Sequence, residues 1–341
     1  MNPNNRWLFL FLKSTPCLSR CRHCDFAVSK TFVPMSLENS IRYIHPFVIA
    51  RGTSTVTYDR VSVLFGDAPL NHDNFPDAIT YLKQNDIEGW SNIPANGFRF
   101  QSLENWRAFL ERARNSGVRI LEFTLYGKAE AHDWFAVRKD DYRAIHALAR
   151  LWHQLGGDTY WRVFVHKKNF VELSEIRSEI LNQYGKPCIA THWSYLGHGA
   201  RIEDLRLEVD DLNRVDDDTR TQLKDFKPES DWVTRFATSV EPPFPTDPGI
   251  LHVVVDREGN ATLPYTLALK GHAGLELGNI EQPPGDFIRM WESRYHTWGN
   301  SYPPVGELCR KYGDPAGKRL YDAKSIIRKW CHAFEITTKI E

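Results

Sequence analysis

The sequence has 341 residues, 42% of them hydrophobic, and its 43 basic and 43 acidic side chains leave no net charge. This length and composition predict one large globular domain, or a large domain with a smaller one beside it. A neutral balance argues against the long-range positive field of a nucleic-acid-binding protein. We therefore expect no nucleic-acid partner.

The first apolar run, Trp7–Leu12, predicts a buried strand. It is too short for the core of a signal peptide or for a membrane span. We therefore expect a cytoplasmic protein without a membrane partner. In that reducing compartment, clustered cysteines indicate metal or redox chemistry rather than disulfides.

Strand-like and helix-like segments then alternate up to residue 200. Apolar runs predict strands at residues 7–12, 61–65, 119–126, 161–165 and 188–196, with a short extended segment ending at 93–97. Amphipathic patterns predict helices at residues 37–50, 74–84, 103–115, 142–155 and 173–181. Such alternation indicates a parallel sheet with right-handed crossovers. The predicted fold class is α/β, a partial (β/α)6 TIM-like barrel that binds ligands at the carboxyl ends of its strands.

The texture of the sequence changes after Ala200. Residues 203–230 are very polar and residues 240–249 are rich in proline, which predicts a solvated linker or insertion. Two apolar runs around a polar turn at 256–260 predict a β-hairpin, and helical patterns follow at 286–291 and 323–334. The expected domains are a barrel core (1–200), a linker (201–249) and a small α+β extension (250–341).

Three cysteines follow the first predicted strand, at Cys17, Cys21 and Cys24, with the spacing C-x3-C-x2-C. Thiolates bind soft metals, but a structural zinc site needs four ligands and an electron-transfer cluster usually has four cysteines. The remaining cysteines, at positions 188, 309 and 331, are scattered. A three-thiolate iron–sulfur cluster would leave one iron open to a substrate or cofactor.

This spacing after a first barrel strand resembles the radical S-adenosylmethionine (radical SAM) superfamily. The resemblance implies a [4Fe–4S] cluster held by Cys17, Cys21 and Cys24, with SAM bound at the open iron. It also implies reductive cleavage of SAM to methionine and a 5′-deoxyadenosyl radical. The electron would come from a reductant such as flavodoxin or ferredoxin.

Other motifs resemble the strand ends that bind SAM in that family. VSVLFGDAPL at 61–70 stands where the family has G-G-E-P, with Asp67 and Ala68 in place of its second glycine and glutamate. IPANG at 93–97 and TLYG at 124–127 resemble the next strand ends. The resemblance implies SAM contacts from His23, Gly66, Asp67, Ala68, Asn96, Thr124 and Arg138. Arg138 would grip the carboxylate and His23 would cover the adenine; the alternatives are a plain turn at GDAP and a solvated charge at Arg138.

The C-terminal residues resemble a SPASM-type extension, with LHVVVDREG at 251–259 as its hairpin. Too few cysteines remain for auxiliary clusters, so we interpret the extension as degenerate. SPASM-like extensions indicate a peptide or peptide-derived natural product as substrate. A small molecule is the alternative substrate, and an iron–sulfur electron carrier or redox sensor is the alternative class of protein.

Overall fold

The computed structural model describes residues 6–24, 34–66, 68–89, 92–192, 197–246, 248–263 and 275–338. Strands and helices alternate through the first part of the chain: β1 (Trp7–Leu12), α1 (Leu37–Ala50), β2 (Arg60–Phe65), α2 (Phe75–Gln84), β3 (Glu88–Gly89), β4 (Asn92–Pro94), α3 (Leu103–Ser116), β5 (Ile120–Leu125), α4 (Ala129–Ala136), α5 (Asp141–Gln154), β6 (Asp158–Phe164), α6 (Leu173–Tyr184) and β7 (Cys188–Thr191). The predicted strands and helices are present here, with ends shifted by one to a few residues. The predicted strand at 188–196 is described only as far as β7, since residues 193–196 lie outside the described residues.

Local sequence signals set the ends of several helices. The Ser36 hydroxyl accepts a hydrogen bond from the Asn39 N–H at the start of α1, and Ser102 does the same for Asn105 at the start of α3. Gly117 ends α3 in the left-handed conformation, with φ 111°. These signals fix where α1 and α3 begin and where α3 ends, shortly before β5.

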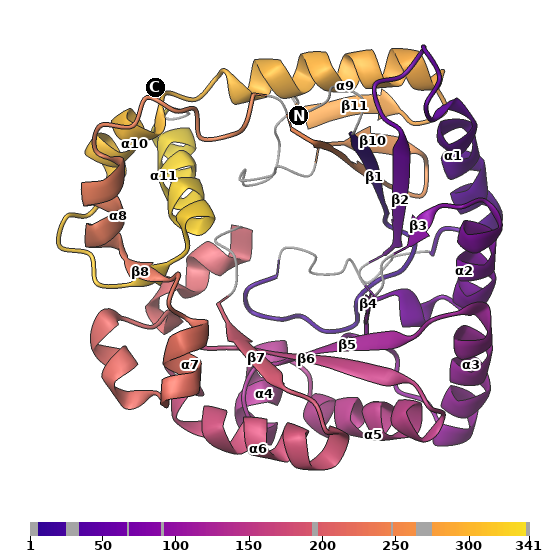
Figure 1. Ribbon diagram of the computed structural model, residues 1–341, viewed down its shortest axis with the longest axis horizontal. Coiled ribbons are helices and arrows are strands. Elements are labelled where there is room, and N and C mark those ends of the chain that lie inside the picture. Colours follow the sequence, from indigo (N-terminus) through magenta and orange to yellow (C-terminus); the bar gives the residue numbers. More distant parts are fainter. Residues whose placement is uncertain are drawn as a thin grey trace.

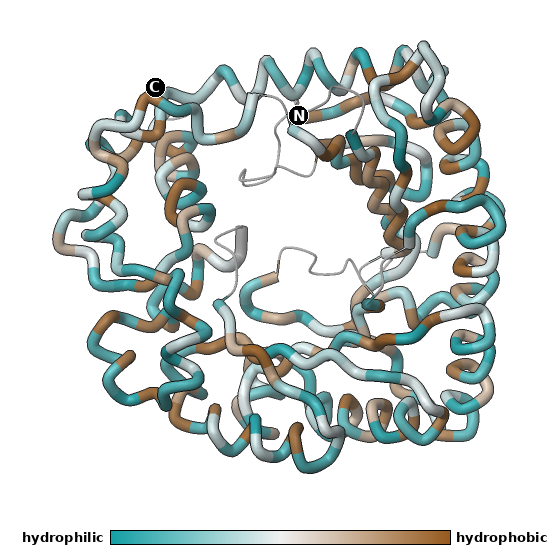
Figure 2. The backbone as a smooth tube through the Cα atoms, in the orientation of Figure 1, coloured by the Kyte–Doolittle hydropathy of each residue, from teal (hydrophilic) through white to brown (hydrophobic). Residues whose placement is uncertain are grey.

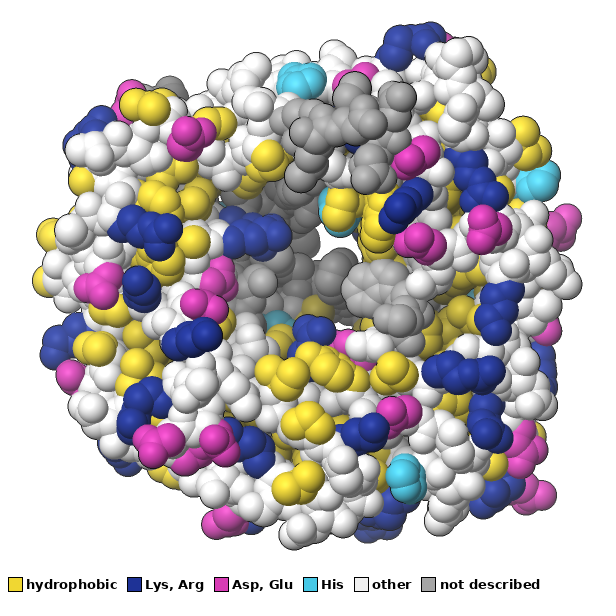
Figure 3. Space-filling model, viewed as in Figure 1, with side chains coloured by type: hydrophobic (Ala, Val, Ile, Leu, Met, Phe, Trp, Pro, Cys, Tyr) yellow, Lys and Arg dark blue, Asp and Glu magenta, His cyan; other side chains and the backbone are white. Residues whose placement is uncertain are grey.

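A mixed sheet and a parallel sheet form two walls of a ring (Figure 1), and the space-filling view shows a hollow at its centre (Figure 3). β1 pairs in parallel with β2, and β2 with β3, while β4, β5, β6 and β7 form the second sheet in chain order. Helices α1 to α6 cover the outside of these walls (Figure 1). The predicted partial α/β barrel is therefore confirmed.

The C-terminal part of the chain completes the ring. β9 (Ile250–Val255) pairs in parallel with β1 and forms the predicted hairpin with β10 (Asn260–Thr262), which continues into β11 (Glu276–Asn279). α9 (Pro284–Gly299) covers this sheet, and α8 (Glu229–Phe236), α10 (Val305–Tyr312) and α11 (Ala323–Thr338) close the remaining side (Figure 1). The division at residues 200 and 249 stays a prediction.

The polar stretch at 203–230, for which the composition predicts a solvated linker or insertion, contains regular secondary structure. It contains short helices at Gly197–Leu205, Val209–Arg214 and α7 (Asp217–Gln222), and β8 (Lys227–Pro228) pairs with β12 (Leu320–Tyr321). Leu207 and Leu223 are buried there. The charges are accommodated by pairing: the fully buried Arg206 contacts Glu203 and lies over the Tyr321 ring.

In β1, β5, β6 and β9 a fully buried face alternates with a more exposed one, whereas β2 is buried at five consecutive positions. Leu8, Leu10 and Leu12 of β1 are completely buried, while the residues between them are half-buried. β5, β6 and β9 show the same alternation. We assign the half-buried set to the hollow, because helices cover the other face; the tube in Figure 2 shows apolar residues along β1 and its neighbours. No helix in the described residues is long and apolar enough to cross a membrane.

Candidate cofactor site

The loop that carries the three cysteines follows the carboxyl end of β1 and is fixed by backbone hydrogen bonds. The Leu18 N–H donates to the Gly97 carbonyl at 2.8 Å. The Arg20 and Arg22 N–H groups donate to the carbonyls of Ala136 and Phe135, each at 3.0 Å. The loop is thereby anchored both after β4 and at the end of α4, as well as at β1.

The three thiols share this loop and influence one another. Cys21 is buried, and Cys17 and Cys24 are half-buried. Burial raises the pKa of Cys21; a hydrogen bond with the Tyr126 side chain opposes this, and the charges of Cys17 and Cys24 add to it. Among the described residues, however, no group of three or more His, Cys, Asp or Glu side chains is arranged to hold a metal ion. The sulfurs would have to converge to bind one.

Two glycines allow the strand ends to approach this loop closely. A Cβ on Gly97 would overlap the Cys17 sulfur, and a Cβ on Gly66 would overlap Thr15. Both have positive φ, 67° at Gly97 and 73° at Gly66, which a side chain would disfavour. The close packing thus explains the glycines in IPANG and GDAP.

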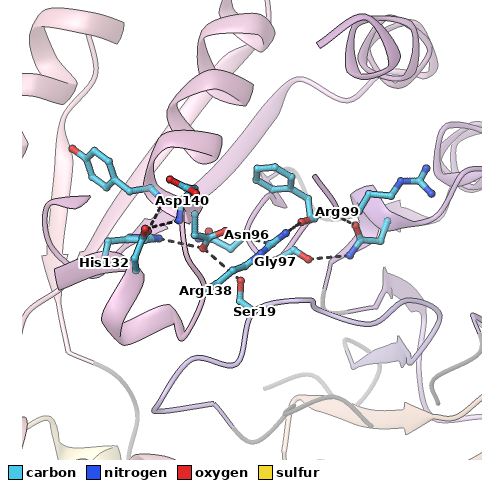
Figure 4. Close-up of polar contacts among 12 residues, drawn as sticks. Ser19, Asn96, Gly97, Arg99, His132, Arg138 and Asp140 are labelled. Atoms are coloured by element: carbon cyan, nitrogen blue, oxygen red, sulfur yellow. Dashed lines mark hydrogen bonds and ion pairs between the residues drawn. The ribbon is translucent and has the colours of Figure 1, made fainter. Parts of the chain in front are cut away.

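A buried carboxylate, Asp141, joins the cysteine loop to the barrel wall. Figure 4 labels its partners Ser19, His132 and Arg138. It accepts hydrogen bonds from the Ser19 hydroxyl at 3.5 Å and from Arg138 Nη1 at 3.2 Å. His132 contacts the same oxygen as Ser19, with Nε2 at 3.3 Å from Asp141 Oδ2. Because the Tyr126 N–H donates to His132 Nδ1 at 3.1 Å, we assign the histidine proton to Nε2.

The predicted SAM ligand Arg138 is a member of this buried network. Its Nη2 donates to the Phe98 carbonyl at 2.6 Å, and its guanidinium lies 3.8 Å from the centre of the Phe100 ring. Burial lowers the pKa of Arg138, and Asp141 counteracts this shift. The arginine is therefore held in place by protein groups, and its contact with a SAM carboxylate stays a prediction.

The remaining predicted SAM residues lie around the same strand ends. His23 sits among the rings of Tyr126, Phe135 and Phe164, and burial lowers its pKa to about 4. Asn96 uses its side-chain amide to accept from the Thr124 N–H at 2.7 Å and donate to the Thr124 carbonyl at 2.8 Å. This leaves the Thr124 side chain on the half-buried face of β5.

The Ala68 carbonyl accepts from the Thr15 hydroxyl at 3.0 Å, so this backbone is also held against the cysteine loop. Asp67 lies outside the described residues. Sequence reasoning missed Asp141, Tyr126 and Ser19. The Tyr126 signal was present, because it belongs to the TLYG motif, whereas Asp141 and Ser19 carry no motif.

The other three cysteines lie away from the loop. Cys188 is in β7, Cys309 in α10 and Cys331 in α11, each nearly or fully buried as a free thiol. Burial raises the pKa of Cys188 to about 12. Each of the three is thus placed as a small core residue.

No protein-family model matches the chain, and no curated protein sequence matches it either. Solved structures with bound AdoMet do match its architecture, in agreement with the resemblance to radical SAM enzymes. One is anSMEcpe with bound AdoMet, which is 12% identical, with 98% of each chain covered and a TM-score of 0.57. Another is the same protein with AdoMet and the Cp18Cys peptide, at 13% identity, 98% coverage of each chain and a TM-score of 0.56.

SuiB of Streptococcus suis, bound to S-adenosylmethionine, is 12% identical with a TM-score of 0.56, over 95% of this chain and 77% of that one. At such identities the likeness defines the fold alone. The chain has the radical SAM fold, and the similarity extends over nearly its full length, including the C-terminal residues that close the ring.

Proposed function

We propose that this chain is a radical SAM enzyme that uses one [4Fe–4S] cluster to abstract hydrogen from a peptide or a peptide-derived natural product. The observation that carries the proposal is the position of Cys17, Cys21 and Cys24. They lie on one loop at the carboxyl end of β1, in the fold of enzymes whose structures hold AdoMet. In barrels of parallel strands this end carries the chemistry.

The chemistry of the donor set fits a cluster with one open iron. Three thiols are available on the loop, and the other three cysteines of the sequence are in β7, α10 and α11. When bound, such a cluster supplies the electron that cleaves SAM to methionine and a 5′-deoxyadenosyl radical. A flavodoxin or ferredoxin would deliver that electron.

The chain's own residues would hold SAM and exclude water. The backbone at Gly66 and Ala68, with Asp67, is proposed to bind the amino group, and the Thr124 hydroxyl to bind the methionyl or ribose part. His23 is proposed to lie against the adenine and Asn96 to fix Thr124, while Arg138 would add a charge near the carboxylate. The ring of strands and helices would keep bulk water from the radical.

A peptide substrate is favoured by one neighbour, since the anSMEcpe structure with the Cp18Cys peptide has a TM-score of 0.56 to this chain. A small molecule that enters the same hollow is the alternative. Mass spectrometry of a reaction with candidate substrates and deuterium-labelled positions would separate them, because abstracted deuterium appears in 5′-deoxyadenosine.

The test of the proposal is anaerobic reconstitution with iron and sulfide. We expect about four iron atoms per chain and 5′-deoxyadenosine on addition of SAM and dithionite. Cys17→Ala, Cys21→Ala and Cys24→Ala should each abolish both, while the control Cys309→Ala should retain both. A chain that takes up zinc instead, or a cluster that does not cleave SAM, would contradict the proposal.

A further inference from the structure

A cavity of 490 Å³ lies between the start of β9 and α11, and we call it the α11 pocket. Most of its lining is apolar and includes prolines and aromatic rings: Pro243, Phe244, Pro245, Pro248 and Tyr295. Three nitrogen-bearing side chains complete it, His252, Lys324 and Arg328. Its volume is in the range of pockets that bind small ligands.

The α11 pocket belongs to the wall of the central hollow. His252 is on the half-buried face of β9, and its ring centre lies 5.2 Å from that of Phe9 in β1. α11 lies on the hollow side of α8 and α10 (Figure 1). Figure 3 shows Lys or Arg side chains at the edge of the hollow on this side. A ligand in the pocket would therefore extend toward the hollow.

Lys324 is exposed at the edge of the pocket, and in the described part of the chain no hydrogen bond or ion pair to its amine is found. A carboxylate that influences it, Asp322, accepts from the Ser325 N–H at 2.8 Å and from the Ser325 hydroxyl at 3.0 Å. Burial and the charge of Arg328 lower the pKa of Lys324. Burial also lowers the pKa of His252, so its imidazole is neutral near pH 7.

Two features make Lys324 unfavourable for the stability of α11. Lys324 and Arg328 are four residues apart and both line the pocket, and like charges at this spacing repel. Lys324 is also in the first turn of the helix, where the macrodipole disfavours a cation. A positive charge at this position does not stabilise α11. Its presence therefore suits the binding of an anionic ligand.

We infer that the α11 pocket binds the carboxylate end of the substrate, with Lys324 as its ionic partner and the prolines and aromatic rings around its apolar body. This inference rests on the proposed function and narrows the substrate to acids. A carboxylate fits better than a phosphate, because a dianion takes more donors than this largely apolar lining offers. A peptide C-terminus and a free apolar acid share this chemistry.

The experiment measures binding of matched acids and amides to the cluster-loaded chain by calorimetry. One pair is 3-phenylpropanoate and 3-phenylpropanamide; the other is acetyl-Gly-Phe with a free or an amidated C-terminus. We expect each acid that binds to be roughly tenfold tighter than its amide, as a charge-assisted hydrogen bond predicts. Which pair binds more tightly identifies the source of the carboxylate.

Lys324→Met, alone and with Arg328→Met, should remove the preference for the acid. The control Lys224→Met makes the same charge change at a position that is exposed like Lys324 but does not line the pocket, and it should leave the preference unchanged. Equal binding of acid and amide, absence of binding by either pair, or a preference that survives the double substitution would overturn the inference.

Cleavage of SAM is measured on the same preparations. Cleavage without acid preference would refute the pocket and leave the proposed function intact. Acid preference without cleavage would refute the proposed function and leave the pocket intact.

Discussion

The cysteine loop and the α11 pocket differ in how their charged side chains are compensated. Around the cysteine loop, the buried Asp141 is met by Ser19, His132 and Arg138, all held within 3.5 Å. At the α11 pocket, the exposed Lys324 has no ion pair among the described residues and is four residues from a second cation, Arg328. The charge of Asp141 is thus balanced by protein groups, whereas that of Lys324 is not balanced among the described residues.

This difference separates two roles. A buried network in which each charge has partners fixes its members in one geometry, which suits a loop that must present three thiols. A cation that lowers stability where it stands is retained for recognition, since the ligand supplies the missing charge. The comparison predicts that removing the charge of Asp141 destabilises the protein and that removing the charge of Lys324 stabilises it.

The largest effect on stability is expected for Asp141→Asn, which disrupts the buried network around this carboxylate. It removes the buried negative charge and leaves Arg138 and His132 to share one neutral acceptor. Loss of one partner from a buried charge pair typically costs about 3 to 5 kcal/mol. We expect a decrease of that size in the free energy of unfolding, measured by urea denaturation.

Asp140→Asn is the matched control. Asp140 is exposed, with φ 61°, and asparagine tolerates that left-handed conformation. Its substitution should change the free energy of unfolding by less than about 0.5 kcal/mol. If Asp141→Asn were as mild as this control, the network would not hold the loop.

A smaller effect on stability, but a specific one on iron, is expected for Gly97→Ala. The new methyl group would overlap the Cys17 sulfur, in addition to the strain of a positive φ of 67°. The strain alone costs about 1 to 2 kcal/mol. We expect that loss of stability together with a fall of at least about half in the iron bound on reconstitution, because the Cys17 thiol is displaced from the donor set.

Gly52→Ala separates the two causes. Gly52 has nearly the same backbone conformation, φ 69°, but nothing lies within 4 Å of the added Cβ. It should therefore show the loss of stability without the loss of iron. Equal iron content in the two variants would mean that Gly97 does not set the position of Cys17.

Much of the barrel around the cysteine loop could be predicted from the sequence, because the signals for its elements are local. The run WLFLFL, the stop at Gly117 and the spacing of the cysteines each act within a few residues. Asp141 could not be predicted, because Ser19, one of its partners, is 122 residues away along the chain. A network assembled by the fold leaves no local pattern.

The solvation expected from the composition of residues 203–230 is only partly present, for a related reason. Polarity at 203–230 predicts solvation only when the charges face water, and here several are buried in pairs. Glu229 is 2% exposed and contacts Lys329 and the Trp330 indole N–H. The hairpin at β9 and β10 was predictable from its turn, but its parallel pairing with β1 joins segments more than 240 residues apart and required the structure.

The smallest effect, and the one of opposite sign, is expected for the stability of Lys324→Met. Methionine keeps a similar length and a helix propensity close to that of lysine, and it removes the repulsion from Arg328. The free energy of unfolding without added ligand should therefore rise by about 0.5 kcal/mol. Lys224→Met, which lies outside the pocket, should leave it unchanged within error. A loss of stability in Lys324→Met would show that its charge is already paired in the free protein. The contrast between Asp141 and Lys324 would then fail.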